Sequence, residues 1–461
     1  MIKRYIKYTL LFAVLSGTFS CTKLDLKPTD TIDATKAYRN LNDVNLGLLG
    51  AYAVLDNTLI GLNAIASDEV MLPTENTVSN TDAHRWLYTA GSGSVTTSYS
   101  DYYRAIDRIN RVLAGIDGIT FASSELALRD RYQGELLALR AFCHFELLRA
   151  YGSAYQAGAL GVPYMKVSEI GYPARDPFEV VVANAKADLQ SAKTLIPASF
   201  TDKTRITKLA VAAVQARLAL YEKNWADAIT YSTEVIAAAP LATKAQFPGI
   251  WTDVAENEVI WKLKRIATDT RTGDLFYRQT GGIVLYAPSS KLINTFDKVN
   301  DVRYTAYIKF DATRTGTKSQ YLVNKYIGGT ASAPGQADIK MFRTGEMYLI
   351  RAEAEAESTG DAAGDLNTLR AARITGYTNA TFADKGTLIE AINTERFKEL
   401  AFEGHRFFDL RRRNLPVQRL AADAINTSGA VTLLPTQAQY AFPLPALELS
   451  VNKNTIQNPK Y

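Results

Sequence analysis

Residues 123–151 read SSELALRDRYQGELLALRAFCHFELLRAY, an unbroken helical pattern. Apolar side chains recur in it every three or four residues, which places them along one buried stripe of a helix. The members of this stripe are Leu128, Tyr132, Leu136, Leu139, Phe142, Cys143, Leu147 and Ala150. A second long helix is expected just before it, near 99–117. The stretch therefore predicts a core built from packed helices.

The rest of the chain continues the helical pattern in separate blocks. Asp176-Pro177 is typical of a helix start, with Asp as the N-cap and Pro at the first helical position. We expect helices over 34–59, 177–195, 204–222, 225–239, 341–358, 361–373 and 386–404, with loops over 60–98 and a few short strands within 240–340. In two helix pairs, 204–239 and 341–373, small residues alternate with aromatic ones as in tetratricopeptide pairs.

Composition excludes several classes of protein. The 461 residues are 47% hydrophobic and 21% charged, as in an ordinary globular protein. The net charge of +5 falls to +2 once the first 20 residues are set aside, too little for a nucleic-acid partner. With only Cys21 and Cys143, neither a disulfide framework nor a thiolate metal site is expected.

Other cofactor signals are weak. The three histidines, His84, His144 and His405, lack metal-ligand spacing. The loop GSGS at 91–94 has neither the lysine nor the following helix of a phosphate cradle. We therefore predict no metal and no cofactor.

The N-terminus has the pattern of an export signal. Basic residues at 3–7 precede a short apolar run at 10–15, and small residues stand near residue 20. Cys21 follows directly, as in the acylation site of a bacterial lipoprotein. We expect a signal peptide over 1–20, a lipid anchor on Cys21 and a polar tether over 21–33. The alternative is plain secretion with Cys21 as a free thiol.

Four stretches resemble one known family, and they are LRAFCHFELLRAYG (139–152), MFRTGEMYLIRAEAEA (341–356), ERFKELAFEGHRFFDLRRRN (395–414) and PLPALELSVNKNTIQNPKY (443–461). Together they resemble the SusD/RagB family, although Lys460 stands where glycine is usual. The resemblance implies a mainly α fold of tetratricopeptide-type helix pairs with few short strands. It implies one domain over 34–461, with the helical scaffold at about 34–239 and 341–413 and a loop-rich binding face at about 240–340 and 414–461.

The resemblance also implies a function. Such proteins are lipid-anchored at the outer-membrane surface, where they capture glycans for a SusC-like TonB-dependent transporter and catalyse no reaction. A RagB-like protein that binds peptides for uptake is the alternative.

Aromatic residues in loops are the candidates for glycan contact, because a sugar ring stacks its C–H face on an aromatic face. Trp86 lies in TDAHRWLYTAGSGS, where Asp82 and Arg85 supply hydrogen-bonding groups. Tyr286, in GGIVLYAPSSKLINTF, is the second candidate and Tyr277 is a weaker one. The alternative for Trp86 is a ring that caps the helices. Trp225 is expected in the core and Trp261 in a buried strand.

The segment 395–413 contains Glu395, Glu399 and Glu403, spaced four apart with arginines nearby. A glycoside hydrolase places two carboxylates on either side of its substrate. Carboxylates on one helical face do not flank a substrate, so we predict a structural ion-pair network, with Phe397, Leu400, Phe402 and Phe407 packed beneath. A hydrolase is the alternative.

Overall fold

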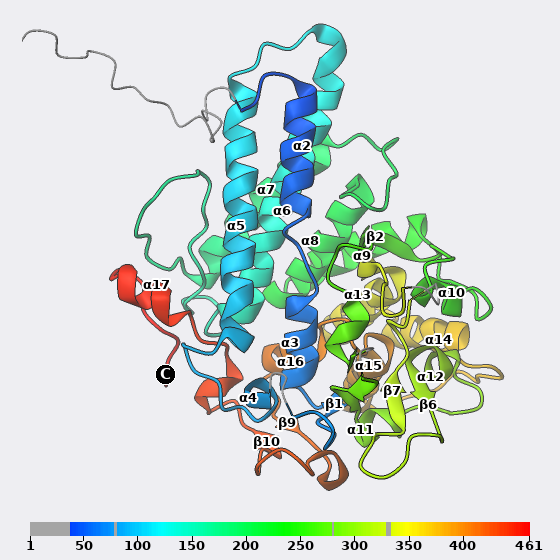
Figure 1. The fold of residues 1–461 in the computed structure, drawn as a ribbon. Helices are drawn as coiled ribbons and strands as arrows, with labels where there is room; N and C mark the ends of the chain where they lie inside the picture. The colour runs from blue at the N-terminus through cyan, green and yellow to red at the C-terminus, as the bar shows by residue number, and fades with distance from the viewer. Residues whose placement is uncertain (1–36, 78–80, 279–280, 329–332) are drawn as a thin grey trace, which may run out of the picture.

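The computed structural model describes residues 37–77, 81–278, 281–328 and 333–461. Its helices are α2 (Leu41–Tyr52), α3 (Thr58–Ala66), α4 (Thr81–His84), α5 (Gly93–Asp117), α6 (Leu126–Tyr151), α7 (Phe178–Leu195), α8 (Lys208–Glu222), α9 (Trp225–Ala238), α10 (Phe247–Trp251), α11 (Ser290–Ile293), α12 (Val302–Tyr307), α13 (Thr344–Glu357), α14 (Ala362–Arg373), α15 (Lys385–Glu399), α16 (Arg406–Arg412) and α17 (Ala446–Val451). The fold is mainly α, as predicted (Figure 1).

The helical hairpin of α5 and α6 forms the long axis of the molecule, with α2 beside it (Figure 1). The second half of α6, from Leu136 to Tyr151, is almost wholly buried, since α5, α7 and α8 surround it. Gly134 permits the close approach of α7, because a Cβ there would stand 2.8 Å from Cγ1 of Ile196. The apolar stripe of 123–151 is therefore the centre of the core, as predicted.

Two tetratricopeptide-type pairs extend this layer. Helix α8 packs on α9, helix α13 packs on α14, and α13 also packs on α9. The close approach of α8 rests on alanines with no exposed surface, such as Ala212 and Ala216. Trp225 packs half-buried against the core at the start of α9. Both predicted pairs are confirmed.

Two sequence-based boundaries were wrong. The region 60–98 was expected to be loop, but it contains most of α3, all of α4 and the first turns of α5. The N-cap of α7 is Pro177, not Asp176. The carboxylate of Asp176 instead accepts a hydrogen bond of 2.8 Å from the backbone N–H of Tyr164, so it fixes the preceding loop.

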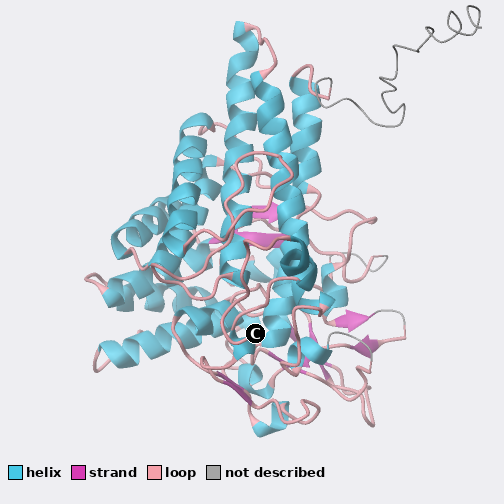
Figure 2. Ribbon diagram, turned by 90° about the vertical axis from the view of Figure 1, so that its left-hand side faces the viewer, coloured by secondary structure: helices cyan, strands magenta, loops and turns pink. Residues whose placement is uncertain are grey.

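The described strands form five antiparallel pairs: β1 (Val70–Met71) with β5 (Ala287–Pro288), β2 (Val259–Leu263) with β8 (Ile339–Arg343), β3 (Tyr277–Arg278) with β4 (Ile283–Val284), β6 (Ile308–Phe310) with β7 (Tyr321–Val323), and β9 (Val417–Gln418) with β10 (Thr432–Leu433). Trp261 in β2 is fully buried against Phe142 and Phe342, as predicted for a buried strand. Most of the small pairs lie with loops in the lower part of the molecule (Figure 2). We call this region, residues 67–77, 264–278, 281–288 and 308–328, the loop face.

The expected signal peptide, Cys21 and the whole of the expected tether lie outside the described residues. Within the described ranges, no helix has both the length and the apolar character that a bilayer span requires.

Candidate ligand-binding site

Trp86 does not present an exposed ring, so this expectation was wrong. The residue follows α4 with a left-handed backbone (φ 53°), which turns the indole inward until only 7% of it is exposed. Its indole N–H donates a hydrogen bond of 2.9 Å to the carbonyl of Ala66, and the guanidinium of Arg419 lies 4.1 Å from the ring centroid. The capping alternative describes Trp86 correctly.

Tyr286 is also buried, with 1% of its surface exposed, and its ring packs 5.8 Å from that of His84. The residues on either side of Tyr286 are also buried, and His84 of α4 packs against its ring. The sequence around Tyr286 looked like a loop and did not predict this burial. Asp82 and Arg85 are half-buried, and both hold structure: Asp82 accepts a hydrogen bond from the hydroxyl of Ser94, and Arg85 donates one to the carbonyl of Asn426. The structure does not assemble these residues into an exposed site.

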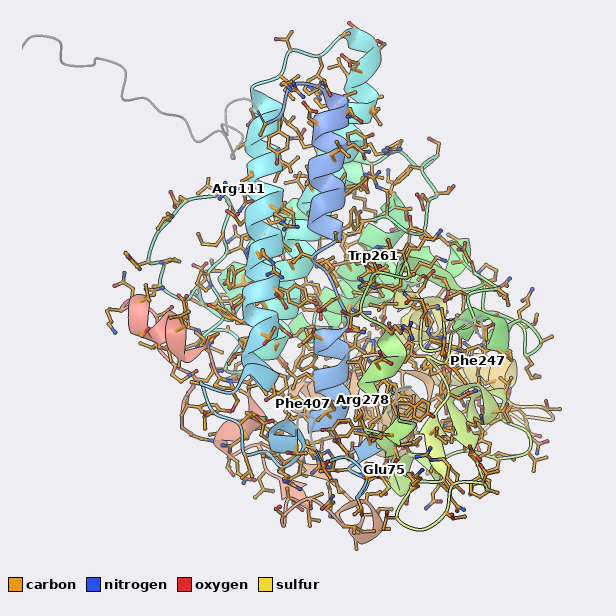
Figure 3. All side chains as sticks on the ribbon, in the orientation of Figure 1. Glu75, Arg111, Phe247, Trp261, Arg278 and Phe407 are labelled. Atoms are coloured by element: carbon orange, nitrogen blue, oxygen red, sulfur yellow. The ribbon has the colours of Figure 1, made fainter. Side chains whose placement is uncertain are left out.

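Tyr277 is the one predicted aromatic whose ring stays half-exposed, on β3 in the loop face. The guanidinium of Arg314 lies 5.9 Å from its centroid. Arg314 also forms an ion pair of 2.7 Å with Glu75, which accepts hydrogen bonds from the backbone N–H groups of Val284 and Ser319. This ion pair ties together three segments of the loop face, and Figure 3 labels Glu75 and the exposed Arg278 there.

Two aromatic residues that we did not predict lie on the neighbouring hairpin. Phe310 in β6 and Tyr321 in β7 stand directly opposite each other, with ring centroids 5.0 Å apart. Phe310 is 51% exposed and Tyr321 is half-exposed. The run YIKFDATRTGTKSQYLV (307–323) has the pattern of a hairpin, but only the strand register shows that the two rings pair.

We call Phe310 and Tyr321 the aromatic platform. Its two rings offer apolar faces, and the pairing of β6 with β7 holds them opposite each other. Tyr277 packs instead in the cluster of Leu322, which points to the other face of the hairpin, so Tyr277 is not part of the platform. Exposed aromatic faces of this kind suit a ligand that is apolar on its faces and polar at its edges.

The described surface also has a groove away from the aromatic platform. A groove of about 970 Å³ runs between the start of α8, the end of α9 and β2. Its polar lining includes Lys203, Thr243, Gln246, Glu256 and Asn257, while Phe200 is its one aromatic ring. We call it the helix-pair groove, and its size falls within the range of ligand sites.

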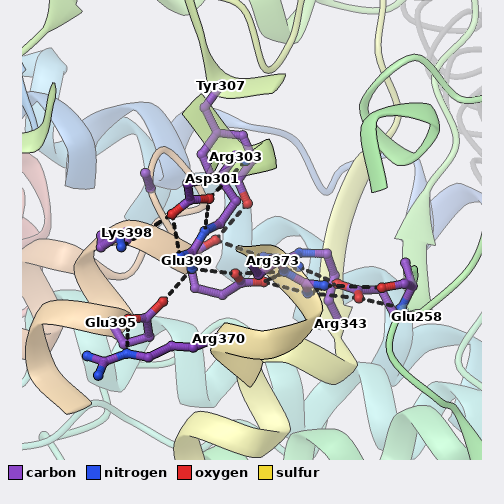
Figure 4. A network of polar contacts seen from close by, with 12 residues as sticks. Glu258, Asp301, Arg303, Tyr307, Arg343, Arg370, Arg373, Glu395, Lys398 and Glu399 are labelled. Atoms are coloured by element: carbon purple, nitrogen blue, oxygen red, sulfur yellow. Dashed lines mark hydrogen bonds and ion pairs between the residues drawn. The ribbon is translucent and has the colours of Figure 1, made fainter. Parts of the chain in front are cut away.

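The three glutamates of the 395–403 segment are buried in an ion-pair network, as predicted. Figure 4 shows the part of this network around Glu395 and Glu399. Glu395 pairs with Arg303 and Arg370 at 2.6 and 2.7 Å. Glu399 pairs with Arg303, Arg343 and Arg373 at 2.9–3.0 Å. Glu403 pairs with Arg343 and Lys325, each at 2.6 Å. The rings of Phe397, Phe402 and Phe407 and the side chain of Leu400 are buried beside the network.

The network keeps these carboxylates ionised. Burial acts to raise the pKa of Glu395, but the charges of Arg303, Lys398 and Arg370 outweigh it and hold the pKa at about 2. Burial likewise opposes ionisation of Glu399, and its three arginines again lower the pKa. Because each carboxylate is occupied by cations and closed off from solvent, none is placed to donate a proton to a substrate.

Comparisons with known proteins agree with this fold. A family model described as "SusD family" matches residues 294–461, and one described as "Starch-binding associating with outer membrane" matches residues 27–220. The chain belongs to the SusD/RagB family.

Individual relatives are distant but of similar length. SusD-like protein P25 of Formosa agariphila is 23% identical, over 89% of this chain and 90% of its own. The starch-binding protein SusD of Bacteroides thetaiotaomicron is 32% identical, but over only 27% of this chain and 22% of its own.

Solved structures share the fold. A SusD superfamily protein from B. thetaiotaomicron superposes with a TM-score of 0.82 at 22% identity, covering 91% of this chain and all of its own. A SusD-like carbohydrate binding protein from Bacteroides vulgatus gives 0.78 at 23% identity, covering 91% of this chain and 98% of its own.

Proposed function

We propose that this protein captures glycans at the outer-membrane surface and passes them to a SusC-like TonB-dependent transporter without altering them. The observation that carries the proposal is the aromatic platform, where the half-exposed ring of Phe310 lies beside Tyr321. The names of its relatives support the ligand class, since one is a starch-binding protein and one a carbohydrate binding protein. The name of one matching family model supports the location.

A binding role without catalysis fits the state of the carboxylates. Glu395, Glu399 and Glu403 are held by arginine and lysine side chains. Two stacking rings contribute about 0.5–1.5 kcal/mol each. With a few hydrogen bonds, the total affinity is about 4–8 kcal/mol, in the millimolar to micromolar range. Such affinity permits release to a transporter.

The platform is tested by calorimetry with maltoheptaose and by glycan arrays, using wild type, Phe310→Ala and Tyr321→Ala. We expect each variant to lose about 2- to 12-fold in affinity, because each removes one stacking face. Phe121→Ala serves as the matched control, because Phe121 is a half-buried ring at the far end of the α5–α6 hairpin. Unchanged affinity in both platform variants would remove the platform from the site, and blank arrays would reject glycan capture.

The lipid anchor is tested separately. When the full chain is expressed in a Gram-negative host with labelled palmitate, we expect label on the protein and its loss in Cys21→Ser. Label that persists in the variant would contradict anchoring at Cys21.

A second function, peptide capture, is favoured by the helix-pair groove. Its volume of about 970 Å³ and its hydroxyl, amide and charged lining suit an extended peptide. If glycan arrays are blank and a peptide mixture binds wild type but not Gln246→Ala/Asn257→Ala, this function replaces the first.

A further inference from the structure

A small pocket lies in the seam between three consecutive helices. Helices α7 and α9 both pack on α8, and a pocket of about 150 Å³ lies where the three meet. We call it the seam pocket. Its lining includes Lys186 from α7, Gln215, Leu218 and Glu222 from α8, and Asp227 and Tyr231 from α9. Figure 1 shows these helices above the hairpin of β6 and β7, so the pocket is separate from the aromatic platform.

The floor of the seam pocket contains a polar atom that lacks a partner. Gln215 is 5% exposed, and its Oε1 has no hydrogen-bond partner among the residues that the structure describes. A buried amide oxygen that stays unpaired costs about 1–3 kcal/mol. A molecule in the pocket that donates a hydrogen bond to Oε1 removes this cost. The ligand that fits the floor therefore carries at least one donor group.

The rim of the pocket supplies a donor and acceptors close together. The ammonium of Lys186 lies 2.9 Å from the carboxylate of Glu222 and 3.3 Å from that of Asp227. These three side chains are 29–37% exposed, so a ligand can reach them from solvent. An ionised carboxylate accepts several hydrogen bonds, so both carboxylates keep acceptor capacity beside Lys186. Because the carboxylates outnumber the ammonium, the rim disfavours an anionic ligand.

The rest of the surface is apolar. Leu218 lies three residues beyond Gln215 on the same face of α8, and the half-buried ring of Tyr231 forms a wall. The ammonium of Lys193 holds this ring from outside the pocket, since it lies 4.9 Å from the ring centroid and pairs with Glu234 at 2.5 Å. The pocket thus combines an apolar floor and wall with fixed polar groups at its edges.

The size of the pocket restricts the ligand further. One water takes about 30 Å³, so the pocket has room for more than a single water. Sites for drug-sized ligands begin at about 300 Å³, so only one small ring fits. Hydroxyl groups both donate and accept hydrogen bonds, which suits a floor that needs a donor and a rim of mixed polarity.

We propose that the seam pocket binds a single neutral sugar ring. One ring hydroxyl donates to Oε1 of Gln215, others bind the carboxylates of Glu222 and Asp227, and the C–H face of the ring packs on Leu218 and Tyr231. This site goes beyond the aromatic platform, which offers two open rings to the side of a glycan chain. The seam pocket encloses one sugar unit, and either site can fail without the other.

The test is an NMR titration of the full chain, labelled with ¹⁵N-glutamine and carrying Phe310→Ala/Tyr321→Ala to remove the platform. The side-chain amide signals of Gln215, identified by their loss in Gln215→Leu, should shift saturably at millimolar D-glucose, D-galactose or D-mannose. The uronic acid of the sugar that binds should bind about two- to fivefold more weakly, because its carboxylate meets the rim. No saturable shift with any of the three sugars would overturn the proposal. An equal shift with glycerol would also overturn it, because the pocket would then accept any small polar solute.

A substitution at the floor gives a second readout. By saturation-transfer NMR observed on the sugar, Gln215→Leu should bind about tenfold more weakly or worse, because the ring hydroxyl loses its acceptor. Leucine leaves no unpaired oxygen in the floor, so the variant should unfold at the same temperature as its parent or higher. Gln133→Leu is the matched control, because Gln133 is a half-buried glutamine on α6 outside the pocket. Equal affinity in Gln215→Leu and Gln133→Leu would contradict the site.

Discussion

At the scale of single residues, burial decides what an aromatic ring does. Trp86 and Phe310 both lie in polar, loop-like sequence, but Trp86 is 7% exposed and Phe310 is 51% exposed. The first therefore contributes to stability, and only the second has a face available to a ligand.

Trp86→Ala should lower the free energy of unfolding by about 3–5 kcal/mol, because it leaves a cavity and removes the hydrogen bond to Ala66. Phe310→Ala should change it by less than about 0.5 kcal/mol. Urea unfolding followed by circular dichroism measures both. Equal decreases in the free energy of unfolding for the two variants would mean that the two rings are buried to the same extent in solution.

Glu69 is a buried carboxyl whose ionisation opposes folding. It is 1% exposed, one oxygen accepts a hydrogen bond from the backbone N–H of Phe402, and the other has no hydrogen-bond partner among the described residues. Burial raises its pKa to about 8, even though Lys325 and Arg406 act against the rise. The folded protein therefore keeps the proton of Glu69 to a higher pH than the unfolded chain does.

The pKa of Glu69 is about 4.5 in the unfolded chain and about 8 in the folded protein. The protonated carboxyl therefore stabilises the folded protein fully below pH 4.5, and this contribution is lost as the pH rises toward 8. A glutamine at this position does not ionise, so the free energy of unfolding of Glu69→Gln should not fall in this pH range. Between pH 5 and pH 8 the difference between the variant and wild type should therefore shift by about 1–3 kcal/mol in favour of the variant. Asp68→Asn is the matched control, because Asp68 pairs with Arg406 and Lys291 and its loss should destabilise at pH 7. Parallel pH curves for wild type and Glu69→Gln would show that Glu69 ionises normally.

At the scale of elements, α15 joins the helix pairs to the loop-rich region through its buried glutamates. Arg303 comes from α12, Arg343 from β8 and Arg373 from α14, and all three bind Glu399. Elements that are far apart in the chain are thus held in one arrangement by one side chain.

Glu399→Gln should lower the free energy of unfolding by about 3–5 kcal/mol, because three buried guanidinium groups lose their shared countercharge. Glu390→Gln, on the exposed side of α15, should change it by less than about 0.5 kcal/mol. Thermal and urea unfolding at pH 7 test the pair. A small effect at Glu399 would mean that solvent reaches the network.

At the scale of the whole molecule, the network makes the fold sensitive to acid. The pKa values of Glu395 and Asp68 are held at about 2, because nearby cations outweigh the effect of burial. The pKa values in the unfolded chain are about 4.5 for Glu395 and 3.8 for Asp68. The lowered pKa values therefore stabilise the folded protein above this range, and the contribution is lost as the pH falls toward 2.

We therefore expect the free energy of unfolding to fall steeply between about pH 4.5 and pH 2, by several kcal/mol in total. Urea unfolding at a series of pH values measures it. Glu399→Gln should show a shallower fall, because it has already lost one of these carboxylates. A flat profile would contradict a network ionised in the native state.

The sequence by itself determined the helical scaffold. The apolar stripe of 123–151, the small and aromatic alternation of 204–239 and the glutamates of 395–403 all predicted structure that was found. These patterns are local. A helix repeats every 3.6 residues, so a short stretch of sequence is enough to show which of its faces is buried.

Only the tertiary structure decided where the loop residues lie. Trp86 turned inward because Ala66 and Arg419 close around it. Tyr286 turned inward because His84 of α4, distant from it in the chain, packs against its ring. Phe310 and Tyr321 became a pair because the register of β6 and β7 sets them opposite each other. Exposure and pairing are properties of packing between distant segments, and no periodic pattern in a single loop records them.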